Sequence, residues 1–178
     1  MKRRRVSITS AVIVATLAVA SSAAGAPRGG LGLATWHGVG PLRFGRSTPA
    51  DLQRFAGRPD HVAPLNGATL GGMNYSAEDL IYRFSDHGSA QYYFVNPDGH
   101  WVLDGFETSL PRFHTARGTH TSMSLGDAEK REGIHRTSST CIGPALLRRS
   151  RGGELGVLIS GSRVIELFAL GPRAFAFC

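Results

Sequence analysis

Two stretches of the chain repeat the same spacing of capping and stop residues, 76 residues apart, beginning at Thr48 and at Ser124. In each stretch the hydroxyl residue is followed three positions later by an aspartate and nine positions later by a glycine, Gly57 or Gly133. A hydroxyl side chain satisfies free N–H groups at a helix start, an acid in the first turn favours that end, and glycine closes a helix. The spacing therefore predicts one short capped helix, used twice.

Runs rich in β-branched and aromatic residues follow each predicted helix, with short turns between them, which is typical of antiparallel hairpins. The runs are 80–84, 90–95 and 100–106 after the first helix, and 145–149, 154–160 and 162–170 after the second. The predicted fold class is α+β: two tandem repeats of a short helical segment followed by three or four antiparallel strands, forming one sheet with the helices on one face. Residues 60–78 fit either a second short helix or a loop.

The first 26 residues have the layout of a secretory signal peptide. A basic segment, 2–5, precedes the apolar run 11–20, and small residues allow cleavage near Ala24 or Ala26. The apolar run is shorter than the about 20 residues that cross a bilayer. Three consecutive arginines at 3–5 also fit a twin-arginine export signal. We expect a protein that is secreted or lies on the exterior of the cell envelope, with no membrane span once the signal is removed.

The rest of the chain divides into a flexible Gly-rich leader, 27–40, and a single domain, 41–178, with repeats at about 41–112 and 113–178. The formal net charge is +7 for the whole chain, and four of the positive charges lie at 2–5. The mature chain is therefore about +3, too weakly basic to predict a nucleic-acid partner. A monomer is expected.

Cys141 and Cys178 are the two cysteines. An exported chain with an even number of cysteines predicts a disulfide between them. A catalytic or metal-binding thiol is the less favoured alternative, because the sequence has no CxxC pair.

Motifs for catalysis or cofactor binding are absent from the sequence. It has no G-x-S-x-G elbow, phosphate loop or H-x-x-x-H pair, and its Gly29–Gly32 run follows the signal and not a strand. We predict no catalytic, metal or cofactor residues and a non-enzymatic protein. A small secreted hydrolase is the alternative, because serines and histidines are plentiful.

An aromatic group within the first hairpins is the candidate protein-binding site. Alternation along a strand places Tyr92 and Phe94 on one face and Tyr93 on the other, and it likewise separates Leu103 from Phe106. An open aromatic face is what protein-binding sheets use, although both faces could instead be covered. The predicted partner is another secreted or envelope protein. The candidate residues are Tyr82, Tyr92, Tyr93 and Trp101.

The helix-then-hairpins unit, with its capped start and the ending Gly57–Asp60, resembles the superfamily of the small outer-membrane-assembly lipoproteins and beta-lactamase inhibitory protein. The likeness covers residues 40–178, and it implies a tandem pair of units and, as an alternative function, inhibition of a secreted or envelope enzyme such as a beta-lactamase. Two departures stand out. The lipidated cysteine of the first branch is absent, and this chain can form one disulfide where the inhibitor is expected to hold one in each unit.

Overall fold

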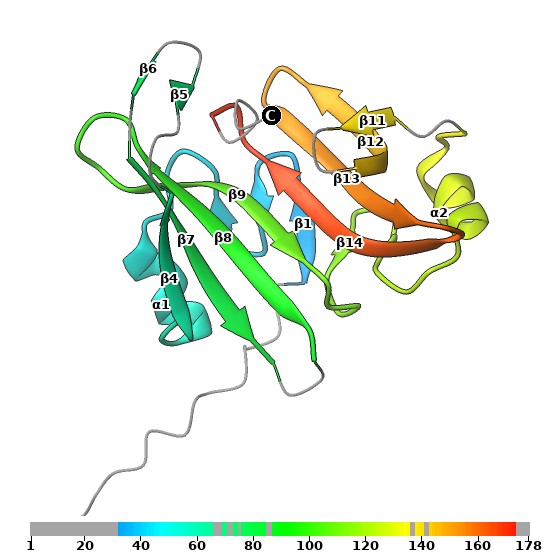
Figure 1. Ribbon diagram of the computed structural model, residues 1–178, viewed down its shortest axis with the longest axis horizontal. Helices are drawn as coiled ribbons and strands as arrows, with labels where there is room; N and C mark the ends of the chain where they lie inside the picture. The colour runs from blue at the N-terminus through cyan, green and yellow to red at the C-terminus, as the bar shows by residue number, and fades with distance from the viewer. Residues whose placement is uncertain are drawn as a thin grey trace, which may run out of the picture.

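The computed structural model describes residues 32–65, 69–70, 73–74, 76–84, 87–135, 138–140 and 143–173. The predicted signal peptide, 1–26, and the cysteines Cys141 and Cys178 lie outside the described residues. The described residues form two helices and fourteen strands (Figure 1). The helices are α1 (Pro49–Ala56) and α2 (Leu125–Glu132), and the strands are β1 (Leu33–Thr35), β2 (Gly38–Val39), β3 (Leu42–Arg43), β4 (His61–Leu65), β5 (Thr69–Leu70), β6 (Met73–Asn74), β7 (Ser76–Arg83), β8 (Ser89–Asn96), β9 (Val102–Thr108), β10 (His114–Thr115), β11 (Ser138–Thr140), β12 (Gly143–Ser150), β13 (Gly153–Ser160) and β14 (Arg163–Leu170).

Eight strands form the main sheet, in the order β11-β12-β13-β14-β9-β8-β7-β4. Each neighbouring pair in this sheet is antiparallel. Two smaller sheets, β10-β1-β2-β3 and β5-β6, accompany it, so the prediction of one sheet is incomplete. The described chain is mostly β-sheet with two short helices, which agrees with the α+β class.

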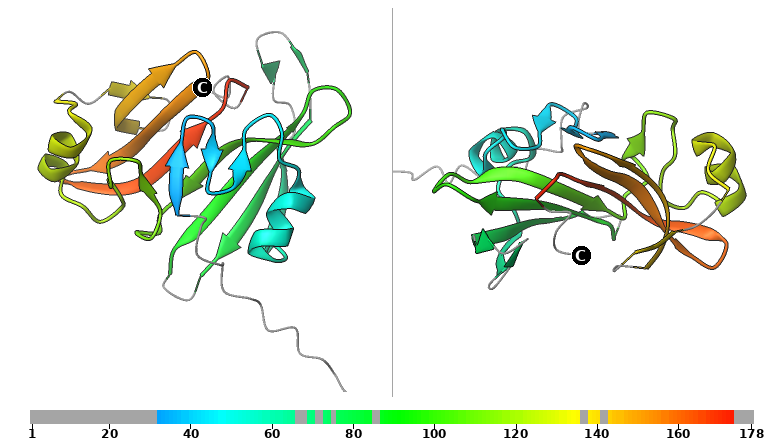
Figure 2. Two further views of the ribbon diagram at one scale, coloured as in Figure 1. Left: turned by 180° about the vertical axis from the view of Figure 1, so that it is seen from behind. Right: turned by 90° about the horizontal axis from the view of Figure 1, so that it is seen from above.

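The residues predicted as a flexible leader contribute to the fold from position 32 onward, so that prediction is wrong for 32–40. They form β1 and β2, and Ala34 and Val39 are fully buried. Gly38, with φ of 147°, allows a close approach, because a Cβ there would lie 1.9 Å from the Leu42 carbonyl oxygen. Glycine marks a tight backbone contact here and not a loose segment. Seen from behind, β1–β3 and α1 lie in front of the strands of the first half of the main sheet (Figure 2).

Both predicted helix caps are confirmed. The Asp51 N–H donates to Thr48 Oγ1 at 3.3 Å, and the Thr48 N–H donates to Asp51 Oδ2 at 2.9 Å, which completes a capping box on α1. On α2 the Asp127 N–H donates to the Ser124 hydroxyl at 3.1 Å. Gly133 ends α2 in the left-handed region with φ of 63°.

Residues 60–78, for which a second helix or a loop was predicted, contain an edge strand instead. His61–Leu65 form β4, which pairs with β7. Pro64 is tolerated because an edge strand does not need every N–H for pairing. The hairpin strands predicted after each helix are confirmed within a few residues at their ends.

The principal core lies on one face of the main sheet. Leu52 of α1 and Ala128 of α2 belong to the same buried cluster as Leu80, Tyr92 and Leu167 of the sheet. A smaller buried cluster, Ala145, Leu158, Phe168 and Leu170, is formed by residues that alternate with the core positions and therefore lie on the opposite face.

One predicted alternation is broken by a bulge. Leu103 and Phe106 were assigned to opposite faces, yet both are fully buried in the principal core. The pairing of β8 with β9 shifts between Tyr93 and Phe94, so that Tyr93 faces Gly105 while Phe94 faces Leu103. The shift inserts one extra residue, which reverses the alternation beyond it.

Candidate functional site

Three carboxyl groups and one tyrosine lie near one another on the face of the main sheet opposite the principal core. We call Asp79, Tyr93, Glu107 and Glu166 the carboxyl patch; they come from β7, β8, β9 and β14. Each alternates with a residue of the principal core, as Tyr93 does with Tyr92. Neighbouring strands that are distant in sequence thus bring the four side chains onto one surface.

Strand register accounts for the contacts within the carboxyl patch. Asp79 is directly opposite Tyr93 on the neighbouring strand. Glu107 is paired with Gln91, two residues from Tyr93, so Tyr93 and Glu107 are diagonal neighbours. The Tyr93 hydroxyl donates a hydrogen bond to Glu107 Oε2. Burial, followed by the negative charge of Glu107, raises the pKa of Tyr93, so its hydroxyl stays a donor at neutral pH.

Glu107 and Glu166 form a carboxyl–carboxyl pair. Burial raises the pKa of Glu166 to about 8, and the charge of Glu107 and a side-chain hydrogen bond between the two groups act in the same direction. Two carboxyl groups that lie close together cannot both ionise cheaply, which favours the protonated form of Glu166. At neutral pH Glu166 is therefore predominantly a protonated hydrogen-bond partner of Glu107.

Asp79 is the most buried member of the carboxyl patch, with 5% of its surface exposed. Burial raises its pKa to about 7, the charge of Glu107 raises it further, and a hydrogen bond with the Tyr92 backbone opposes them. Its Oδ1 atom is buried without a hydrogen-bond partner in the described part of the chain. A buried polar atom left in this state costs free energy that a donor from outside could recover.

The predicted aromatic site is not assembled as one surface. Tyr82 and Tyr92 are buried in the principal core, with 4% and 2% exposed, and their rings meet edge to face at 5.6 Å. Trp101 is half-buried and packs against the same core. Of the four candidates, only Tyr93 lies on the opposite face, because it alternates along β8 with the core residues Tyr92 and Phe94.

Sequence reasoning missed Asp79, Glu107 and Glu166. Each lies within or directly beside a predicted hairpin strand and next to a residue of the principal core, and for Glu166 the neighbours on both sides are apolar, which was a usable signal. Their grouping depends on the pairing of β9 with β14, which joins strands about sixty residues apart and leaves no mark in the local pattern.

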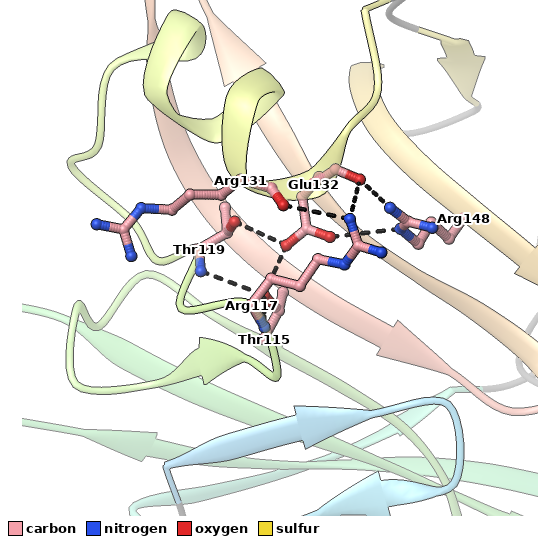
Figure 3. Close-up of polar contacts among 6 residues, drawn as sticks. All are labelled: Thr115, Arg117, Thr119, Arg131, Glu132 and Arg148. Atoms are coloured by element: carbon pink, nitrogen blue, oxygen red, sulfur yellow. Dashed lines mark hydrogen bonds and ion pairs between the residues drawn. The ribbon is translucent and has the colours of Figure 1, made fainter.

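A second polar cluster surrounds Glu132 at the end of α2 (Figure 3). The hydroxyls of Thr115 and Thr119 donate to Glu132 Oε1 at 2.6 and 2.7 Å, and Arg148 Nε donates to Oε2 at 3.4 Å. The Glu132 carbonyl oxygen accepts from Arg117 at 2.8 Å and also from Arg148. Both carboxylate oxygens and the helix-end carbonyl are satisfied, so the hydrogen bonds of this cluster fix α2 to the sheet.

No group of three or more His, Cys, Asp or Glu residues suited to hold a metal ion occurs among the described residues. Within the same residues, neither helix is long and apolar enough to cross a membrane. The disulfide predicted for Cys141 and Cys178 concerns residues outside the described ranges.

Comparisons of this chain with protein-family models, curated proteins and solved structures gave no match.

Proposed function

We propose that this chain is an exported, non-enzymatic protein-binding module that uses the carboxyl patch to hold a basic segment of a secreted or envelope partner. Export follows from the signal-peptide pattern of residues 1–26, and the binding role follows from the carboxyl patch. The single observation that carries the proposal is the buried Oδ1 of Asp79, without a partner in the described chain, near the carboxyl groups of Glu107 and Glu166.

The proposed architecture is two tandem units joined edge to edge, with both helices on one face of the sheet. In chain order α1 is followed by β4, β7, β8 and β9 of the main sheet, and α2 by β11, β12, β13 and β14. The last strands of the two series, β9 and β14, are antiparallel neighbours at the centre. A duplicated unit paired about a twofold axis produces this order, which supports the sequence echo and the resemblance to the lipoprotein and inhibitor superfamily.

A basic partner fits the chemistry of the carboxyl patch better than a metal ion does. The carboxyl groups do not converge as a metal cage within the described residues. A lysine or arginine side chain offers several donors on one cation, enough to satisfy Asp79 and Glu107 together.

Catalysis by these carboxyl groups is less favoured, because two cavities of the described chain, one beside Trp36 and one beside Glu132, are lined by no residue of the carboxyl patch. An enzyme needs a concave site around its reacting groups. For the alternative of a small hydrolase, no serine hydroxyl is hydrogen-bonded to a histidine ring in the described part of the chain.

Binding should depend on pH in a defined direction. A cationic partner favours the ionised carboxyl groups, so its binding releases the protons held by Asp79 and Glu166. Peptides selected from a random display library against the mature protein should be rich in lysine and arginine, and their affinity by calorimetry should rise about fivefold or more from pH 6 to pH 8.

The matched variants are Glu107→Gln with Glu166→Gln, which removes both carboxyl groups of the pair, and Glu129→Gln on α2, which removes one carboxyl group elsewhere. The paired variant should lose most of the affinity and its pH dependence, while Glu129→Gln should bind as the wild type does. Selected peptides without basic residues, or equal binding by both variants, would contradict the proposal.

A second candidate function, inhibition of a secreted enzyme such as a beta-lactamase, is favoured by the eight-stranded antiparallel sheet with its central pairing of two helix-plus-strand series. The mature chain should then slow hydrolysis of a chromogenic cephalosporin by purified serine beta-lactamases. The Tyr93→Ala variant should inhibit these enzymes less strongly than the Arg58→Gln variant does. Full enzyme rates across the panel at micromolar protein would remove this candidate and leave the binding module standing.

A further inference from the structure

A cavity of about 440 Å³ lies between the small sheet that contains β1, β2 and β3 and the second half of the main sheet. No residue of the carboxyl patch lines it. One wall is the segment from Trp36 to Arg46, and the other is formed by Gly152, from the turn between β12 and β13, and by Pro172. The volume is in the range of small-molecule sites.

Aromatic rings and cationic side chains dominate the lining. Trp36 and Phe44 are half-buried and pack against the principal core, which fixes their rings. Arg43 and Arg46 line the same space, together with His37, and no carboxylate is among the lining residues. No ion pair among the described residues involves Arg43 or Arg46. Within the described residues, the cavity therefore combines flat apolar surface with positive charge that no carboxylate pairs.

Hydrogen bonds hold both walls in place before any ligand arrives. The Gly45 N–H donates to the Leu103 carbonyl at 2.7 Å, and the Leu103 N–H donates to the Ser47 carbonyl at 2.7 Å, which attach one wall to β9. The N–H groups of Gly171 and Arg173 donate to Asp104 of the same strand at 2.6 Å each, which attaches the other. A site that is organised in advance loses less free energy in ordering when it binds.

A third guanidinium adds to the charge at the rim. Arg173 Nη1 lies 3.7 Å from the position that a Cβ on Gly45 would take, so its side chain reaches across to the other wall. Guanidinium groups bind carboxylate and phosphate oxygens through paired N–H donors, and aromatic rings stack on planar apolar groups.

We infer that this cavity is a binding site for a small planar anion, an apolar ring that carries a carboxylate or phosphate group. The ring stacks between Trp36 and Phe44, and the anionic group lies against Arg43 and Arg46. The site is separate from the carboxyl patch and does not depend on the function proposed for it.

The test uses 2-naphthoate and 2-naphthyl phosphate as probes, with 2-naphthylmethylammonium as the probe of opposite charge on the same ring. The chain has two tryptophans. Their indole N–H signals in a ¹H–¹⁵N spectrum separate Trp36, which lines the cavity, from Trp101, which does not. Both anions should shift the Trp36 signal in a saturable way and leave the Trp101 signal unchanged. The anion that binds more tightly identifies the preferred anionic group. The ammonium probe should shift neither signal.

Arg46→Gln should weaken binding of the anions about fivefold to tenfold, because it removes a charged donor from the anion. Arg58→Gln, which removes an exposed arginine outside the cavity, should bind as the wild type does. Equal shifts for the anions and the ammonium, shifts at both tryptophans, or equal affinities for the two variants would overturn the inference. The comparison of the probes on the wild-type chain decides the question even where Arg46→Gln does not fold.

Discussion

Burial on the sheet changes the acid–base behaviour of carboxyl groups, although the chain around them carries a net positive charge. The pKa of Glu166 is raised from 4.5 to about 8, and that of Asp79 from 3.8 to about 7, in both cases chiefly by burial. Glu107 contributes its charge to both shifts. A single residue of β9 therefore couples the titration of residues from both halves of the sheet.

The raised pKa of Glu166 predicts that its contribution to stability is lost as pH rises. Between about pH 4.5 and pH 8 the folded chain holds a proton that the unfolded chain has released, so this contribution is full below pH 4.5 and falls through pH 8. Glu166→Gln keeps a neutral side chain at every pH. Its melting temperature relative to the wild type should therefore increase from pH 5 to pH 8, by roughly 2–4 °C.

Thermal unfolding followed by circular dichroism at pH 5, 6, 7 and 8 measures this difference. Asp98→Asn, which changes an exposed carboxylate in the turn before β9, serves as the control and should keep a constant difference from the wild type. A Glu166→Gln difference that is also constant would mean that Glu166 ionises in the folded chain as it does in the unfolded chain.

Each helix is eight residues long, too short to be stable in water without its caps and its contact with the sheet. Leu52 is fully buried on α1, whereas Phe55, three positions later, is 39% exposed, so the apolar contact of α1 is narrow. Ala128 makes the corresponding buried contact on α2. With so little buried surface, the caps carry a large share of the stability of each helix.

Removal of the α1 cap should destabilise the protein measurably. Thr48→Ala removes the acceptor for the Asp51 N–H and should lower the free energy of unfolding by about 1 kcal/mol. Thr48→Ser retains the hydroxyl and should stay within a few tenths of a kcal/mol of the wild type. Urea unfolding measures both. Equal stability of the two variants would show that the capping bond contributes nothing to α1.

At the scale of the whole molecule, the two halves of the main sheet meet through only four residue pairs, Leu167–Leu170 of β14 with Gly105–Thr108 of β9. The principal core continues across this junction, because Phe106 and Leu167 both belong to it. Asp104 strengthens the junction by accepting bonds from the backbone that follows β14. Both the carboxyl patch and the cavity lined by Trp36 and Arg46 contain residues from the two sides of this junction, so each needs the two halves together.

The predicted disulfide between Cys141 and Cys178 would restrain the second half of the molecule. It closes a loop of 38 residues, which in the chain-entropy model stabilises the fold by roughly 4 kcal/mol. The exported protein should contain no free thiol, and its reduction should lower the free energy of unfolding by that order. The double variant Cys141→Ser with Cys178→Ser should match the reduced wild type and should not respond to reductant. Two reactive thiols in the exported protein would contradict the pairing.

Much of the fold could be predicted from sequence because it is specified locally. The caps at Thr48 and Ser124 are satisfied within four residues, and the hairpin strands follow from the alternation of apolar residues and the turns between them. The leader was misassigned because Gly38 gives the same local signal in a loose segment and in a tight backbone approach. The face of Phe106 was misassigned because a bulge depends on the partner strand and not on the residues of β9 alone.

The candidate sites depended on contacts between distant residues. From the sequence alone, Tyr82, Tyr92, Tyr93 and Trp101 could be recognised as aromatic residues of the predicted hairpins, but the sequence did not show which of them the core would bury. The amino-acid sequence by itself determined the two helices, the hairpins and the α+β class. These features arise from backbone hydrogen bonds and side-chain periodicity over a few residues. Only the tertiary structure decided that Asp79, Glu107 and Glu166 share a surface and that Trp36 and Arg46 share a cavity. The physical reason is that electrostatic coupling and cavity shape depend on distance in space, which the pairing of β9 with β14 and the docking of β1–β3 establish.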